Sequence, residues 1–172
     1  MLSMLKRWLG QDGGAGTDDR SRVTAQRPAV GDFRADLVPN LQAEHKQLLA
    51  LFAELERAAE TNDEMACRSA LDRFTRVLQD HLLTENRHLY GYFSRNPNTN
   101  PDLARRVDDM SSDMLRIGKM LHRFITTYSR ATWTSVLHDQ LRKDLRPIGE
   151  VLVHRIHEEE SVLYPMYQAK AG

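Results

Sequence analysis

The sequence predicts an all-α fold, an antiparallel up-down four-helix bundle that carries an N-terminal arm. From about residue 38 onward, apolar side chains recur three and four positions apart in four successive segments, the period of a helix that packs on one face. No segment shows the alternation of apolar and polar residues that is typical of a strand. Because short links join the segments, neighbouring helices should run antiparallel.

The length of the chain limits the number of domains. A chain of 172 residues and 19.8 kDa fits one domain and a modest tail. Residues 10–22 hold several glycines and charges with few large apolar groups, which is typical of a flexible linker. We therefore expect an N-terminal arm and linker over residues 1–36 and the helical bundle over residues 37–170.

The first two helical segments carry polar residues on an otherwise apolar face. The first begins near residue 38 and ends at Asn62 and Asp63, and its face contains Leu41, His45, Leu48, Leu49, Phe52 and Leu55. The second runs from about 64 to 94, and its face contains Leu71, Phe74, Leu78, His81, Glu85, His88 and Tyr92. A turn of sequence Asn-Pro-Asn-Thr-Asn-Pro follows, and Pro101 suits the first turn of the next helix.

The third and fourth segments complete the predicted bundle. The third spans about 102–129, and its apolar face contains Val107, Met110, Met114, Ile117, Leu121, Ile125 and Tyr128. The fourth spans about 133–169 and contains Pro147, which should kink the helix or split off its first three turns.

Charge balance and cysteine content exclude several functions. Lys+Arg and Asp+Glu are both 24, so the chain lacks the net positive charge that attracts nucleic acid, and no such partner is expected. Cys67 is the only cysteine, which excludes an internal disulfide and favours a reducing, cytoplasmic setting. The longest apolar stretches fall far short of the roughly 20 residues that span a bilayer, so no transmembrane segment is predicted.

Two stretches resemble each other at an offset of 74 residues, and each brings a histidine and a carboxylate onto an apolar helical face. In the first, His81 and Glu85 are four residues apart and project from one face of the helix. In the second, His154 precedes the acidic run from Glu158 to Glu160. A pair of such helices can surround two cations, with imidazoles as terminal ligands and carboxylates as bridges.

The spacing in the second stretch differs by one residue. Aligning Leu89-Tyr90 on Leu163-Tyr164 matches Glu85 with Glu159 but places Arg155, not His154, opposite His81. At about 100° per residue, His154 and Glu159 would lie about 140° apart on an ideal helix, too far for one site. A π-bulge would absorb the extra residue, and such bulges often occur at functional sites. We favour Glu159 as the bridging carboxylate, and Glu158 remains the alternative for a regular helix.

Single histidines on the other two helices complete the candidate site. His45 and His122 alone would indicate little, because a lone histidine on an apolar face is usually a core residue. Burying several ionisable groups on facing helices is costly, however, unless they pair or bind metal. The predicted metal ligands are His45, His81, Glu85, His122, His154 and Glu159, with Glu158 as the alternative to Glu159.

These features resemble the hemerythrin-like HHE cation-binding family over roughly residues 38–168. The resemblance rests on Glu44-His45-Lys46, His81-x-x-x-Glu85 with a following Leu-Tyr, the lone His122, and His154 followed by acids and Leu-Tyr-Pro. It implies two iron ions joined by an oxo or hydroxo bridge, with an open position for dioxygen or nitric oxide. Imidazole and carboxylate suit iron, although another divalent metal such as manganese or zinc would also fit them.

One departure from the family bears on function. Oxygen-carrying hemerythrins are similar except that their third helix carries two histidines four apart, whereas Gly118 and Thr126 stand four residues from His122 here. Four histidines would leave an extra open position, which argues against reversible oxygen carriage. We therefore expect a protein that binds or senses dioxygen or nitric oxide, more a binding protein than an enzyme. The alternatives are iron donation to damaged iron-sulfur clusters, reduction of nitric oxide or peroxide, and a metal-free interaction bundle, and homo-oligomer formation stays open.

Overall fold

The computed structural model describes residues 31–97 and 100–169, and this part of the chain is helical with no strand. The predicted all-α fold is therefore confirmed for these residues. Four long helices form most of it: α2 (Leu37–Glu60), α3 (Glu64–Thr84), α5 (Pro101–Arg130) and α6 (Ser135–Glu158). Residues 1–30 of the expected N-terminal arm lie outside the described residues.

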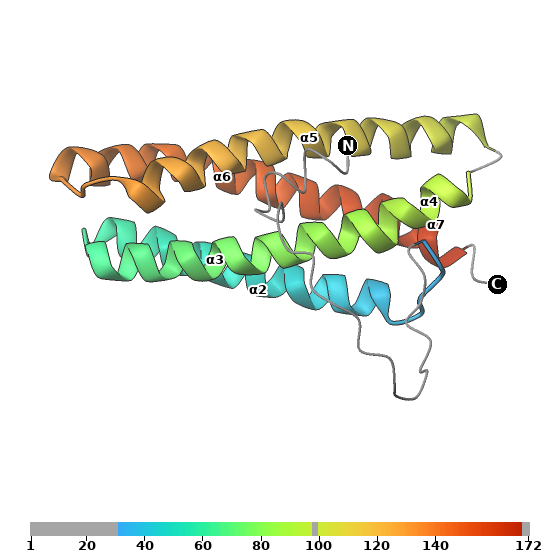
Figure 1. Cartoon of the computed structure of the whole chain (residues 1–172), viewed down its shortest axis with the longest axis horizontal. Coiled ribbons are helices and arrows are strands. Elements are labelled where there is room, and N and C mark those ends of the chain that lie inside the picture. Colours follow the sequence, from blue (N-terminus) through green and yellow to red (C-terminus); the bar gives the residue numbers. More distant parts are fainter. Residues whose placement is uncertain (1–30, 98–99, 170–172) are drawn as a thin grey trace, which may run out of the picture.

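The four long helices lie roughly along one direction, and the chain turns back after α2 and after α5 (Figure 1). Each long helix packs against two others, since α2 contacts α3 and α6, and α5 contacts the same two helices. The bundle therefore encloses an interior bordered by all four.

The helix ends follow from capping residues in the sequence. The side chain of Asp63 accepts a hydrogen bond from the backbone N–H of Ala66 at the start of α3, and Thr134 caps α6 in the same way. Asn100 caps α5, where Pro101 occupies the first helical position. Pro147 does not divide the fourth segment, because α6 is one α-helix from Ser135 to Glu158 with the proline inside it.

Two of the long helices change their hydrogen-bonding pattern near the same end of the bundle. α3 passes into the π-helical segment η1 (Glu85–Tyr90) and then into α4 (Gly91–Arg95). α6 passes into a second π-helical segment, η2 (Glu159–Leu163), and then into α7 (Tyr164–Ala169). Each π-helical segment begins at a glutamate of the two similar stretches. A wider π turn rotates the residues that follow it relative to those before it, and such turns are frequent at functional sites.

The apolar core is divided into two clusters. One extends from Leu48 to Leu152 among the long helices, and the other gathers Leu41, Leu89 and Leu163 with tyrosines near the π-helical segments. Between Leu41 and Leu48 on α2 stands the buried His45, so the boundary between the two clusters is polar.

Candidate metal centre

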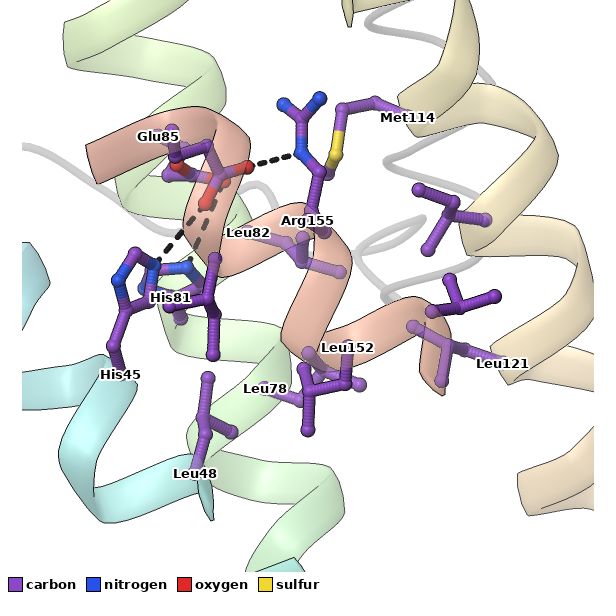
Figure 2. A pocket seen from close by; sticks show the side chains of 14 residues that line it. His45, Leu48, Leu78, His81, Leu82, Glu85, Met114, Leu121, Leu152 and Arg155 are labelled. Atoms are coloured by element: carbon purple, nitrogen blue, oxygen red, sulfur yellow. Dashed lines mark hydrogen bonds and ion pairs between the residues drawn. The ribbon is translucent and has the colours of Figure 1, made fainter. Parts of the chain in front are cut away.

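Four buried side chains converge at this boundary: His45 from α2, His81 from α3, Glu85 from η1 and Glu159 from η2. One donor atom of each lies within 4.8 Å of the donor atoms of the other three. None of the four residues is more than 3% exposed. Figure 2 shows His45, His81 and Glu85, with Arg155, gathered from separate helices around one pocket. Imidazole nitrogens and carboxylate oxygens at this spacing form a donor set that suits a transition-metal cation.

Carboxylates from neighbouring helices orient both imidazoles. The Nδ1 atom of His45 lies 2.8 Å from Oε1 of Glu160, and the Nδ1 atom of His81 lies 2.9 Å from Oε2 of Glu44. Because an ionised carboxylate only accepts hydrogen bonds, each Nδ1–H donates, and each Nε2 atom faces a buried glutamate of the centre. Histidines that bind metal characteristically donate their second N–H to a carboxylate or carbonyl in this way.

Glu85 is buried without a hydrogen-bond partner for either carboxylate oxygen. The nearest imidazole nitrogen, Nε2 of His81, is 3.7 Å from Oε2 of Glu85, which is too far for a hydrogen bond. Burial raises the pKa of Glu85 well above its ordinary value, and the negative charge of Glu159 raises it further. An unpaired buried carboxylate is costly, and a cation bound beside it would remove that cost.

Glu159 is equally buried but has partners on two sides. Its Oε2 atom lies 3.1 Å from Nε2 of His45, and its Oε1 atom accepts a hydrogen bond from Nε of Arg155. Burial alone would raise the pKa of Glu159, but the hydrogen bond with His45 and the positive charge of Arg155 outweigh it and lower the pKa. The two glutamates of the centre therefore differ in their pairing, not in their burial.

Arg155 is a buried cation at the edge of the donor set. Besides its ion pair with Glu159, it donates hydrogen bonds to the hydroxyl of Tyr90 and, over 3.3 Å, to the backbone carbonyl of Met110. Sequence reasoning did not include Arg155 among the site residues. The sequence nevertheless indicates an inward position for Arg155, because the alignment of the two Leu-Tyr pairs places it opposite His81.

Two tyrosines border the centre. The hydroxyl of Tyr164 lies 3.2 Å from Nε2 of His45, and the two rings are stacked with their centroids 5.7 Å apart. Burial raises the pKa values of both Tyr90 and Tyr164 above their ordinary value, so both hydroxyls stay protonated. Their O–H groups are therefore available as donors inside the pocket.

Three of the predicted ligands lie outside the cluster. His122 on α5 and His154 on α6 are exposed, and Glu158 is half-buried. His154 and Glu158 instead line a separate pocket of about 160 Å³ between α5 and α6. The structure thus brings together four of the predicted residues and favours Glu159 over Glu158.

Helical phase explains these positions. α6 remains a regular α-helix up to Glu158, so the expected π-bulge between His154 and Glu159 does not form, and the π turn begins at Glu159 instead. Arg155, four residues before Glu159, takes the inward position as a result. On α5, Leu121 faces the pocket, and the next residue, His122, is turned about 100° away from it.

The fold and its buried His and Glu residues define a class, the helical bundles with an internal group of side chains that could hold a metal ion. The sequence model of the Hemerythrin HHE cation binding domain family matches residues 36–167. The chain therefore belongs to this family, as the resemblance predicted. Searches of curated proteins and of solved structures found no significant match to the chain. None of the helices in the described part of the chain is long and apolar enough to cross a membrane.

Proposed function

We propose that the protein binds iron through His45, His81, Glu85 and Glu159 and that the bound iron takes up dioxygen or nitric oxide. The observation that carries this proposal is the unpartnered, buried carboxylate of Glu85, which lies in one cluster of donor atoms with Glu159 and the imidazoles of His45 and His81. The donor set consists of nitrogen and oxygen atoms, which suits iron, although other divalent metals compete for such ligands. Ferrous iron would supply the electron density that both gases need for binding.

The surroundings of the centre favour a small, neutral ligand. The donor atoms border a small cavity of about 30 Å³, whose other walls include Leu48, Leu78, Met114 and Leu121. This volume is enough for one or two atoms of water size and too small for an organic substrate. Apolar walls disfavour charged ligands, because an ion would lose its hydration without gaining partners. A diatomic gas is small enough for the cavity and carries no charge.

The pocket between α5 and α6 offers a route for such a gas. It shares Ile117, Val151 and Arg155 with the inner cavity, so the two are separated only by these side chains. Its other lining residues include Asp113 and Arg116, which are exposed. A diatomic ligand could pass with small side-chain movements, whereas the carboxylates and imidazoles stay shielded from bulk water.

Beside the donor set, Tyr164 is placed to act on a bound ligand. Its hydroxyl is within hydrogen-bond distance of Nε2 of His45, the atom that we propose as a ligand. Because its pKa is raised, the hydroxyl keeps its proton. When Nε2 of His45 binds a metal, the Tyr164 O–H would be free to donate to the ligand on that metal.

The proposal is tested by metal analysis and gas titration of matched variants. Protein produced with iron supplied should retain iron after desalting, and the anaerobic, reduced form should change its optical spectrum on adding nitric oxide. His81→Ala should lose most of the iron because it removes a buried ligand. His154→Ala, which removes an exposed histidine from α6, should retain the wild-type content.

Three results would contradict the proposal. Wild-type protein with negligible iron after reconstitution would exclude an iron centre. Equal iron loss in His154→Ala and His81→Ala would mean that the ligand set is different. Catalytic consumption of nitric oxide or peroxide by the reduced protein would indicate an enzyme rather than a gas-binding protein.

A further inference from the structure

The two similar stretches contribute different side chains at equivalent positions. His81 precedes Glu85 by four residues, and Arg155 precedes Glu159 by four residues, and both pairs are in contact. A neutral imidazole can offer a lone pair to a metal. A guanidinium stays protonated in proteins and has five N–H donors and no acceptor, so it cannot be a ligand. The second stretch therefore supplies one carboxylate and one fixed positive charge.

The helix α5 supplies no imidazole or carboxylate to the described lining of the cavity. Its contributions are Met114, Ile117 and Leu121. Figure 2 shows Met114 beside Arg155 on the α5 side of the pocket. A thioether is a soft, weak donor, which is poorly matched to iron in a site of nitrogen and oxygen atoms. Both imidazoles thus lie on the α2 and α3 side of the centre.

Arg155 is fixed in its position by three contacts. It is 8% exposed, forms an ion pair with Glu159, and donates to the Tyr90 hydroxyl and to the Met110 carbonyl. Its pKa is raised: burial lowers it, but the negative charge of Glu159 and the hydrogen bond with Tyr90 outweigh that effect. A cation beside it would be repelled, because like charges interact strongly where water is excluded.

One further positive charge would balance the negative charges of the glutamates around the cavity. Among residues 31–97 and 100–169, Glu85 and Glu159 are the buried carboxylates, and the buried Arg155 is the cation that pairs with Glu159. This leaves Glu85 as the carboxylate without a partner. One metal ion on Nε2 of His45, Nε2 of His81 and the glutamate oxygens would satisfy it. Apart from His45 and His81, no imidazole among the described cavity-lining residues is available to bind a second ion.

We propose that the centre is mononuclear, because the guanidinium of Arg155 takes the place of a second metal ion and supplies its positive charge. This inference rests on the proposed function, and it differs from the pair of iron ions that the family resemblance implies. Two imidazoles with one or two carboxylates on a single iron leave coordination positions open for a gas.

The number of metal ions bound by the wild-type chain tests the proposal directly. Metal-free protein is titrated anaerobically with ferrous ion, desalted and analysed for iron and protein. One ion per chain supports both the proposed function and this inference. Two ions per chain overturn the inference and leave the proposed function standing, whereas no bound iron overturns the proposed function itself.

The role of Arg155 is tested by replacing it with the ligand found at the equivalent position. Arg155→His should increase the bound iron from one towards two ions per chain, because it removes the charge and restores an imidazole one turn before Glu159. Arg155→Lys, which retains a positive charge, should remain at one. Arg146→His adds a histidine at an exposed position of the same helix and should also remain at one.

A folded Arg155→His variant that still binds one ion, or an Arg155→Lys variant that binds two, would overturn the role given to Arg155. Folding is checked by circular dichroism and thermal unfolding. Should Arg155→His not fold, electron paramagnetic resonance of the oxidised wild-type protein gives the answer. A high-spin ferric signal that accounts for all the iron supports a single ion, and loss of that signal through coupling of two ions contradicts it.

Discussion

The stretch from α3 into η1 and the stretch from α6 into η2 share one backbone design. Each is a long α-helix that changes to a π turn at a glutamate, Glu85 or Glu159, and continues through a Leu-Tyr pair. One turn before the glutamate stands His81 in the first stretch and Arg155 in the second. A repeated backbone therefore presents a metal donor on one side of the pocket and a cation on the other.

The two glutamates also differ in the direction in which their pKa is shifted. Glu85 has no hydrogen-bond partner and a raised pKa, which burial causes first and the charge of Glu159 second. Glu159 is just as buried, yet the hydrogen bond with His45 and the charge of Arg155 lower its pKa. Burial alone therefore does not decide the charge of a carboxylate in this fold. The groups that pair with the carboxylate, His45 and Arg155 for Glu159, decide it as well.

The largest expected effect comes from removing the cation of the second stretch. In metal-free protein, Arg155→Met should lower the free energy of unfolding by about 3–5 kcal/mol, because it leaves Glu159 as a buried charge without its ion-pair partner. Urea unfolding in the presence of a chelator measures this. Arg146→Met, which removes an exposed ion pair with Glu150 on the same helix, should change it by less than about 1 kcal/mol. Equal effects in the two variants would mean that Arg155 does not stabilise the centre.

Neutralising each glutamate should change the free energy of unfolding by a smaller amount. The direction of the change should differ between the two stretches. In metal-free protein, Glu159→Gln should destabilise the fold by about 2 kcal/mol, since it weakens hydrogen bonds between charged groups. Glu85→Gln should leave stability unchanged or raise it by about 1 kcal/mol, because it removes a carboxyl that burial and the charge of Glu159 make costly to ionise. Chelator-treated variants are compared by urea unfolding. The same loss from both substitutions would show that the two carboxylates are equivalent after all.

The smallest effects are expected from the tyrosines of the two Leu-Tyr pairs, Tyr90 at the end of η1 and Tyr164 directly after η2. Tyr90→Phe should cost about 1 kcal/mol, because it removes one of the oxygens that accept from buried Arg155, which keeps Glu159 and the Met110 carbonyl as partners. Tyr164→Phe should cost about 1 kcal/mol or less but should speed the dissociation of nitric oxide from the reduced, iron-loaded protein. Stopped-flow dissociation measures the second effect. A Tyr164→Phe variant with an unchanged dissociation rate would exclude a hydrogen bond from Tyr164 to the gas.

Much of the centre could be predicted from the sequence because it follows from local spacing. His81 and Glu85 are one turn apart in any helix, and His45 interrupts an apolar face, so both features are visible without a structure. The Leu-Tyr alignment also selects Glu159 in preference to Glu158. The carboxylates that orient the imidazoles could not be predicted, because Glu44 reaches His81 and Glu160 reaches His45 from different helices.

The sequence by itself determined the helical class, the approximate limits of the segments and the four residues of the centre that local spacing places on apolar faces. Only the tertiary structure decided that the π turn starts at Glu159, that α6 stays regular before it, and that Arg155 rather than His154 points inward. The physical reason is that a shift of one residue rotates a helical side chain by about 100°, while apolar spacing tolerates either phase. Packing of the whole bundle determines which of the two phases forms. The phase in turn determines which side chains line the pocket.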